Sequence, residues 1–565
     1  MVSRSSPHSQ TNALADEAWI TRLTPPLSTA HSGALSGLSF AVKDNIDAAQ
    51  VPTTAACPEF AYTASEHAEV VRKLLAAGAS LHGKTNLDQF ACGLNGTRSP
   101  YGAVPNAFNP LYVSGGSSSG SAYVVATGQV DFALGTDTAG SGRVPAGLNN
   151  IVGLKPTRGL ISARGVVPAA QNVDCVSILA RTVATAAQVL RACMGPDAGD
   201  PFSRQLTLNT QALPAQFKFG VPQQLEFFGD VQAKQAFDAS ITHMCALGGE
   251  PVAIDMTPHL QAAAMLYESA LVAQRYAAIQ AFFDAHPEHV MEPVRSIIGK
   301  GSHYSAADYC TAEIHMLGLA QVAHRMWASI DVLLVPTAPT HYTIAQMQAD
   351  PVVLNRNLGH YTNFVNLFDY AALSVPSALR ADGLPFGITL IGPACSDWQL
   401  ADLGQRYHHA TGLTLGATGE PLPAMQAIAG LQAEPTVQVA VVGAHLSGMP
   451  LNSQLTERGA RLLHATTTSA DYQLFALPNT TPPKPGLQRV APGQGHAIAL
   501  EVWEMPMRHY GSFVALIPEP LGIGTVRLAN GTSVQGFVCE PQALIGAQDI
   551  SHFGGWRAYL ASRQP

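Results

Sequence analysis

The sequence predicts an α/β protein with a large first domain and a small, β-rich α+β second domain. From residue 37 to residue 411, short apolar strands alternate with segments of helical spacing. This alternation indicates a central mixed or parallel sheet flanked by helices. After a stretch rich in Gly, Ala and Pro, the pattern changes to short strands separated by turn residues. With 47% hydrophobic and 12% charged residues, the chain has the composition of a globular protein.

The elements of the first domain follow one another in a regular order. Residues 37–47, GLSFAVKDNID, form an apolar strand that ends in charged and turn-forming residues, and residues 66–90 begin with helical spacing. Later strands are expected at 331–339 and 385–393, the last followed by a helix over 396–411. We therefore predict that residues 1–412 form one large α/β domain.

The second domain is expected after a linker over residues 413–436. Residues 437–565 contain short strand-like runs that are punctuated by Pro, Gly and an Asn-Gly turn, which is typical of small β-rich domains. Strands are expected within 437–448, 471–478, 496–506, 512–520 and 524–540.

Charge and composition argue against several classes of partner. The formal net charge of −8 is spread without long runs of either sign, so we expect no nucleic-acid or membrane partner. The N-terminus lacks an apolar signal stretch, which favours a cytoplasmic protein. The eight cysteines form no CxxC pair and are expected to be free thiols. No HExxH spacing occurs, so neither a metal nor a cofactor is expected.

Six serines lie in residues 114–141, SGGSSSGSAYVVATGQVDFALGTDTAGS. A flexible linker would be polar throughout, whereas here the serines border an apolar helix and an apolar strand. A phosphate-binding loop is the competing interpretation, but neither GxxxxGK[ST] nor GxGxxG is present. Ser141 follows the backbone amides of Thr138, Ala139 and Gly140, and a hydroxyl beside amide donors is what a nucleophile and its oxyanion hole require.

A serine nucleophile needs a base, and no histidine lies near these turns in the sequence. Lys43, at the end of the strand SFAVK, is another candidate. A lysine acts as a base only when burial or nearby positive charge lowers its pKa toward neutrality. Its place at the end of an apolar strand is compatible with such burial.

The motifs AVKDN, GGSSSGS, GTDTAGSGR and VGLKPT, in this order, resemble the amidase signature family over roughly residues 35–410. Members of that family use a Ser–Ser–Lys triad on an α/β fold with a central mixed sheet. The resemblance implies that Lys43 is the base, Ser117 the bridging serine and Ser141 the nucleophile. Ser119 and Ala139 stand where glycine is usual, and neither change removes a triad member. The other serines of the stretch are expected to serve in turns and packing.

Tyr267 and Arg275 lie in a long helical stretch, residues 259–283. On one continuous helix they would be ~12 Å apart along the axis and about 80° apart around it. Taken alone, the residues favour a core tyrosine and a solvated arginine. The segment LYESALVAQRYAAI, however, resembles the helix with which allophanate hydrolases bind the substrate carboxylate. A guanidinium that forks onto a carboxylate fits this role.

The second domain adds to this resemblance through VVGAHLSGMPLNSQLTERGARLL and FGGWRAYLA. This resemblance implies that the first domain releases ammonia from allophanate and that the second domain promotes decarboxylation of N-carboxycarbamate. His445 is the candidate for that step, with Asn452 and Arg458 as weaker candidates for holding carboxylates. It also implies a homodimer and a functional link to a urea carboxylase or a biuret hydrolase. Another amidase of the family, or a non-catalytic binding scaffold, remains an alternative.

Overall fold

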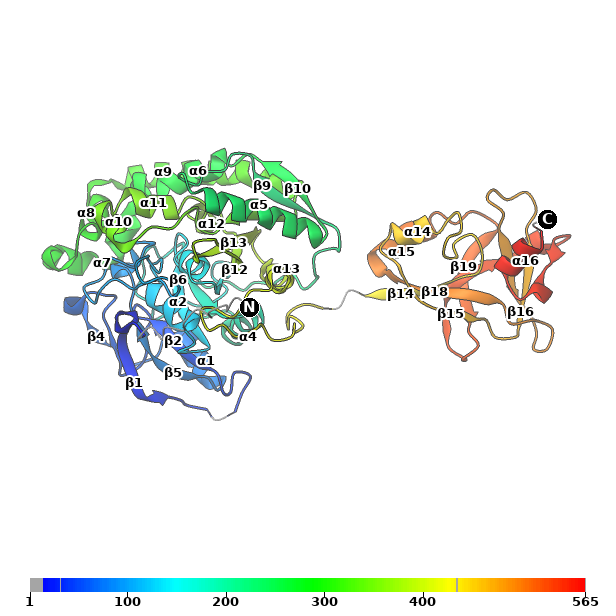
Figure 1. Cartoon of the computed structure of the whole chain (residues 1–565), viewed down its shortest axis with the longest axis horizontal. Coiled ribbons are helices and arrows are strands. Elements are labelled where there is room, and N and C mark those ends of the chain that lie inside the picture. Colours follow the sequence, from blue (N-terminus) through cyan, green and yellow to red (C-terminus); the bar gives the residue numbers. More distant parts are fainter. Residues whose placement is uncertain (1–13, 31, 433–434, 564–565) are drawn as a thin grey trace, which may run out of the picture. The chain divides into compact units, whose positions relative to one another are not determined.

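The computed structural model describes residues 14–30, 32–432 and 435–563. The chain divides into two compact units, residues 1–432 and residues 433–565. In Figure 1 the first unit runs from blue to yellow and the second from yellow to red. Each unit has a hydrophobic core of its own.

The first unit is built on one mixed sheet of 11 strands. β2 pairs in parallel with β5 and β6, and β9 pairs in parallel with β10 and β11, whereas β6, β7, β8, β12 and β13 pair antiparallel with one another. The strands in sheet order are β1 Trp19–Leu27, β5 Ser80–Thr85, β2 Ser39–Lys43, β6 Phe132–Asp137, β8 Cys175–Ala180, β7 Val152–Lys155, β12 Ala371–Leu379, β13 Pro385–Gly392, β11 Val332–Pro336, β9 Phe217–Pro222 and β10 Gly249–Ile254. A two-stranded ribbon, β3 Pro52–Thr53 and β4 Tyr62–Thr63, lies outside it. The predicted mixed sheet is thereby confirmed.

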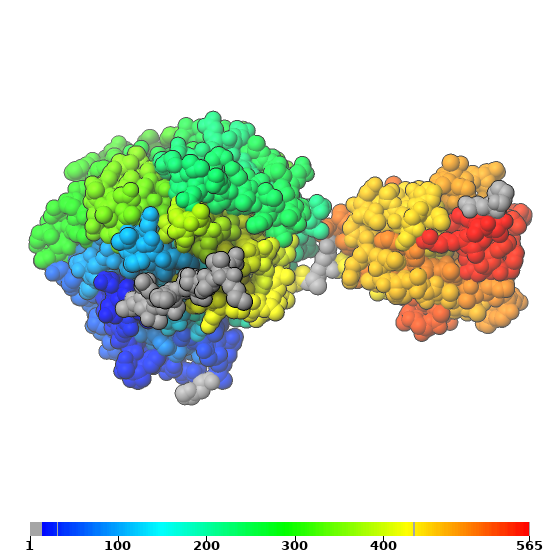
Figure 2. All heavy atoms as spheres, in the orientation of Figure 1, coloured from blue at the N-terminus to red at the C-terminus, as the bar shows by residue number. Residues whose placement is uncertain are grey.

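Helices cover both faces of this sheet because its central strands are apolar on both sides. In β2, Phe40 and Val42 pack with α1, α4 and α13, whereas Ala41 packs on the opposite face against α2. The opposite face also carries α6 and α9, which form an outer surface of the unit (green in Figures 1 and 2). The helices are α1 Glu69–Ala76, α2 Ser119–Ala126, α3 Arg143–Leu148, α4 Val183–Cys193, α5 Val231–Ala246, α6 Thr257–Glu268, α7 Ala273–Ala285, α8 Val294–Gly299, α9 Ala306–Ala323, α10 Ile344–Ala349, α11 Val353–Leu358, α12 Phe364–Leu367 and α13 Asp397–Thr411.

The second unit contains a five-stranded sheet and a three-stranded sheet. The Asn530-Gly531 turn joins β19 to β20 as an antiparallel hairpin, as the sequence predicts. The elements are β14 Thr436–Val441, α14 Ser453–Thr456, β15 Arg461–Thr467, β16 Tyr472–Ala476, β17 Pro485–Arg489, β18 Ala499–Pro506, α15 Met507–Val514, β19 Leu521–Arg527, β20 Ser533–Cys539, β21 Gln548–Asp549 and α16 Trp556–Ser562.

Two expectations about this region are wrong. The strand expected over 512–520 is instead the end of helix α15 and a turn, because Tyr510, Phe513 and Ile517 face the core at helical spacing. Residues 413–432 of the expected linker pack on the first unit: the Ala417 amide donates to the carbonyl of Ala126 at 2.8 Å. Residues 433 and 434 of that linker lie outside the described residues.

None of the helices in the described ranges combines the length and the hydropathy needed to cross a bilayer.

Candidate active site

Lys43 ends β2 and is fully buried in the first unit. Its Nζ lies 2.7 Å from Ser117 Oγ and 2.7 Å from Thr136 Oγ1, so the ammonium contacts two hydroxyls. The pKa of Lys43 is lowered to about 7, mainly by burial; nearby carboxylates oppose this lowering, and the charge of Arg275 contributes to it. A neutral amine is therefore accessible at neutral pH. The sequence analysis did not predict the contact with Thr136. The available signal was that Thr136 lies near the end of the apolar strand β6, which pairs in parallel with β2.

Ser117 lies in the turn that leads into α2, and the peptide bond between Gly116 and Ser117 is cis. Gly116 sits where only glycine fits, since a Cβ would lie 2.2 Å from Asp88 Oδ2. The Asp88 carboxylate accepts hydrogen bonds from the amides of Asn95, Gly96 and Arg98. Asp88 thus joins the Ser117 turn to the neighbouring loop over residues 93–98.

Ser141 lies in the turn after β6, almost fully buried, and its Oγ is 3.4 Å from the carbonyl oxygen of Gly93. The amide of Ser118 donates to the Ser141 carbonyl at 3.3 Å, so the two serine turns are in direct contact. The Ser141 turn is fixed by Asp137, whose carboxylate forms a buried ion pair with Arg143 at 2.9 Å. Sequence reasoning did not single out Asp137 and Arg143, which shape the turn without facing a substrate.

The expected oxyanion hole is only partly compatible with the structure. The Gly140 amide donates to Asp137 Oδ1 at 2.9 Å and is therefore already in use. Gly140 instead has a backbone role, because its φ of +122° and the 2.3 Å between an added Cβ and Thr362 Oγ1 both require glycine. Thr138 and Ala139 stay predictions as amide donors.

Tyr267 and Arg275 come together because the expected single helix is broken. α6 ends at Glu268, Ser269 is extended with φ −128° and ψ 179°, and α7 begins at Ala273 after a short 3-10 turn. Arg275 Nη2 lies 3.3 Å from the Tyr267 hydroxyl, and the guanidinium carbon is 5.1 Å from the centre of the tyrosine ring. The separation expected for one continuous helix is therefore wrong, and the break between α6 and α7 lets the two side chains meet.

Arg275 is an unusual cation because it is buried yet incompletely bonded. Arg275 is 3% exposed, and its Nε and Nη1 have no hydrogen-bond partner among the described residues. Burial raises the pKa of Tyr267, while the Arg275 charge opposes that rise, so the phenol stays protonated at neutral pH. Two unpaired N–H donors and a phenol hydroxyl together suit an anionic, planar acceptor. The expectation of a solvated arginine is wrong.

A cavity of about 670 Å³ in the first unit is lined by Tyr267, whereas Arg275 is not among its lining residues. Tyr267, Arg98, Asn355 and Asn363 are among its lining residues. Asn355 Oδ1 accepts a hydrogen bond from the Leu94 amide at 2.7 Å and so links the cavity wall to the loop that contacts Ser141. Tyr267 therefore both lines the cavity and contacts Arg275.

His445 lies in the second unit beside a separate cavity of about 240 Å³. Its Nε2 is 2.8 Å from Gln454 Oε1, and its ring stacks on Phe537 at 4.9 Å. Burial lowers the pKa of His445, so the ring is neutral at neutral pH. Lys484 also lines this cavity; its place in the proline-rich turn TPPKPG was the signal that could have found it.

Asn452 and Arg458, the two weaker candidates near His445, donate hydrogen bonds to backbone carbonyls. Asn452 Nδ2 donates to the carbonyl of His445 at 2.9 Å, and Arg458 donates to the carbonyl of Gln454 and to Ser512 Oγ. Neither is among the residues that line the cavity. Asn452 and Arg458 therefore position the segment that carries His445 and Gln454.

Comparison with known proteins places the chain in a family. Residues 9–401 match the family model described as amidase, and residues 437–561 match the one described as allophanate hydrolase C-terminal domain. The chain belongs to the amidase family. Its second unit carries the domain that is named after allophanate hydrolase, which narrows the relationship within that family.

Individual relatives agree with this placement. The chain is 46% identical to the urea amidolyase of Saccharomyces cerevisiae over 93% of its own length, but it spans only 30% of that protein. A solved allophanate hydrolase from Kluyveromyces lactis is similar with 42% identity and a TM-score of 0.78, covering 98% of this chain and 95% of that one. The urea amidolyase of Lachancea kluyveri is 43% identical over 98% of this chain, which spans 32% of that protein.

Proposed function

We propose that the chain is an allophanate hydrolase. Its first unit would release ammonia from allophanate by acyl transfer and leave N-carboxycarbamate. The similarity to the K. lactis allophanate hydrolase over nearly the whole of both chains supports this proposal. So does the presence of a second domain of the matching kind.

In the first step, neutral Lys43 accepts a proton from Ser117 while Ser117 takes the proton of Ser141. Ser141 Oγ, turned away from the Gly93 carbonyl, attacks the carbon of the terminal amide. The amides of Thr138 and Ala139 donate to the developing oxyanion. The carbon–nitrogen bond then breaks, and the proton held by Lys43 returns through Ser117 to the leaving ammonia. The 2.7 Å contact between Lys43 Nζ and Ser117 Oγ supports this relay.

In the second step, a water molecule attacks the acyl group on Ser141 and loses its proton through the same relay. The acyl–oxygen bond breaks, N-carboxycarbamate leaves and Ser141 regains its hydrogen. No cofactor enters either step.

The single observation that carries the choice of substrate is the buried Arg275 with two unpaired N–H groups. A buried cation without a full set of partners is costly unless a ligand completes it. Allophanate is a small urea-like amide that ends in a carboxylate, and this carboxylate would accept hydrogen bonds from Arg275 and from the Tyr267 hydroxyl.

The second unit would promote decarboxylation of N-carboxycarbamate, which brings the yield to two ammonia and two carbon dioxide per allophanate. His445 is the proposed acid or base for this step. Its neutral ring, its hydrogen bond to Gln454 and its place beside a cavity with Lys484 support the assignment. Lys484 would attract the anionic intermediate.

The wider setting is proposed on the same basis. We expect a cytoplasmic homodimer in urea degradation and nitrogen metabolism, supplied with allophanate by a urea carboxylase or a biuret hydrolase. The urea amidolyases that the chain resembles are about three times its length, so an activity that precedes this one would reside in another chain or in a further part of the same chain. α9 exposes Ile314, Leu317 and Val322, an apolar surface that suits contact with a second copy.

An ammonia-release assay with allophanate, malonamide and glutamine side by side tests the proposal. Wild type is expected to prefer allophanate, and Ser141→Ala to release no ammonia while it unfolds at the wild-type temperature. A preference for malonamide or glutamine would instead indicate another amidase of the family. No turnover of any amide would indicate a binding scaffold.

A further inference from the structure

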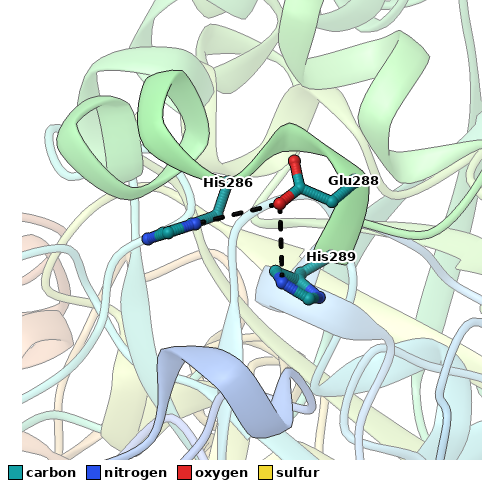
Figure 3. A group of neighbouring side chains, drawn as sticks. All are labelled: His286, Glu288 and His289. Carbon is teal, nitrogen blue, oxygen red and sulfur yellow. Dashed lines mark ion pairs between the residues drawn. The ribbon is translucent and has the colours of Figure 1, made fainter.

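A cluster of potential metal ligands lies on the surface of the first unit, apart from the residues of the candidate active site. His286, Glu288 and His289 belong to the segment HPEH, in and beside a short 3-10 helix over Pro287–His289. Figure 3 shows the three side chains turned toward one another. Each offers one ligand atom, and these atoms all lie within 4.8 Å of one another.

The two distances to Glu288 are close to those between the ligands of a bound metal, and the third separation is at most 4.8 Å. Glu288 Oε1 lies 3.8 Å from His286 Nδ1 and 3.5 Å from His289 Nε2. Ligands about 2.0–2.2 Å from a tetrahedral zinc ion are themselves about 3.3 Å apart. Small rotations of exposed side chains close that difference. None of the three ligand atoms makes a hydrogen bond to another described residue, so no such bond has to break when a metal binds.

The backbone beneath these side chains is fixed. The His289 carbonyl accepts from Gln89 Nε2 at 3.3 Å, and Gln89 Oε1 accepts from the Met291 amide at 2.9 Å. The His286 ring packs near Phe282 at 5.6 Å. Because the segment is held at both ends, its three side chains start from a common geometry and lose little entropy on binding an ion.

A fourth residue completes the arrangement from another part of the chain. Glu59 Oε1 lies 3.7 Å from His289 Nδ1, on the opposite side of the ring from Glu288. Metal-bound histidines commonly give their second ring nitrogen's hydrogen to a carboxylate, which fixes the tautomer and strengthens the ligand. Glu59 is placed for that role, since His289 would bind the ion through Nε2.

We propose that His286, Glu288 and His289 bind one divalent transition-metal ion of the zinc type, with water in the remaining position. Two imidazoles and one carboxylate favour such an ion over calcium or magnesium, which prefer oxygen ligands. The ion would brace residues 286–289, whose His289 carbonyl accepts a hydrogen bond from Gln89, the neighbour of Asp88. Its role is structural, and the proposed hydrolysis does not depend on it.

Titration calorimetry of the full chain with zinc chloride at neutral pH tests this site. The exposed Cys245 and Cys310 also attract zinc, so the measurement uses the Cys245→Ser, Cys310→Ser background. One zinc per chain is expected, and His289→Ala or Glu288→Gln should weaken binding by at least about tenfold. The matched control is His303→Ala, which removes another exposed histidine of a 3-10 helix and should bind as the background does.

A second measurement uses cobalt as a spectroscopic probe. Visible absorption bands of cobalt bound by nitrogen and oxygen should appear in the background protein and disappear in Glu288→Gln, an exposed substitution that leaves the fold intact. Zinc affinity unchanged in both His289→Ala and Glu288→Gln would overturn the proposal. Calcium binding as tight as zinc binding would overturn the assigned chemistry, and so would the absence of binding at millimolar zinc.

Discussion

Replacing Arg275 with glutamine should convert the enzyme from a carboxylate-selective amidase into a weak, unselective one. The substitution removes the buried cation and the two N–H groups, Nε and Nη1, that lack partners. A hydrogen bond between charged groups contributes about 1.5–3 kcal/mol. Loss of two such bonds, partly offset by the glutamine amide, costs about 3 kcal/mol, which corresponds to roughly a 100-fold fall in kcat/KM for allophanate.

The assay compares allophanate with malonamide, which has no carboxylate. Because the Arg275 charge also lowers the pKa of Lys43, the substitution should shift the pH profile to higher pH. Both substrates are therefore compared at a pH above the rising part of both pH profiles, where Lys43 is neutral in wild type and in the variant. There, malonamide turnover should change less than about threefold. Arg295→Gln, which removes an exposed arginine paired with Glu292, is the control and should match wild type. Equal losses on both substrates, or full activity on allophanate, would refute the role of Arg275.

Four further predictions concern the base, the second unit and the buried ion pair. In the proposed mechanism the neutral form of Lys43 is the active one, and its pKa is about 7, so kcat/KM should rise with pH through about 7; a flat profile from pH 6 to 9 would contradict this. Because that pKa lies below the 10.5 of an ordinary lysine, the folded state binds fewer protons than the unfolded state between these values. The Lys43 contribution to stability therefore improves as pH rises from about 7 to about 10.5, and Lys43→Met should be inactive yet melt higher than wild type at neutral pH. His445→Ala should release the first ammonia at the wild-type rate while N-carboxycarbamate accumulates, observable by carbon-13 NMR; a proportional loss in the first step would argue against separate roles. Arg143→Met leaves the Asp137 carboxylate buried without its partner and should lower the free energy of unfolding by about 3–5 kcal/mol; a loss below about 1 kcal/mol in denaturant titration would show that the ion pair does not support the Ser141 turn.

The order of strands and helices was predictable because the apolar runs of the large sheet are continuous and separated by clear turns. Strand β2, ending at Lys43, and strand β6, leading to Ser141, are visible in the sequence for this reason. Residues 512–520 were mistaken for a strand because a short apolar run is compatible with a strand and with the end of a helix. Only the core contacts of Tyr510, Phe513 and Ile517 decide it.

Within the site, motif order singled out Lys43, Ser117 and Ser141 as the predicted triad, but it contained no information about contacts made by folding. The approach of Arg275 to Tyr267 depends on the extended conformation of Ser269 between two helices. Nothing in the run LYESALVAQRY breaks a helix by propensity. The use of the Gly140 amide by Asp137 likewise depends on a side chain folding back onto its own turn. The HPEH cluster escaped a search for HExxH because its ligands meet across a 3-10 turn rather than along one helix face.

The number of ammonia molecules released per allophanate, in wild type and in Ser141→Ala, tests the central proposal most directly. Hydrolysis through Ser141 followed by decarboxylation predicts two ammonia and two carbon dioxide per allophanate in wild type, and none above the uncatalysed background in the folded variant. Ammonia release by folded Ser141→Ala at the wild-type rate would contradict the account.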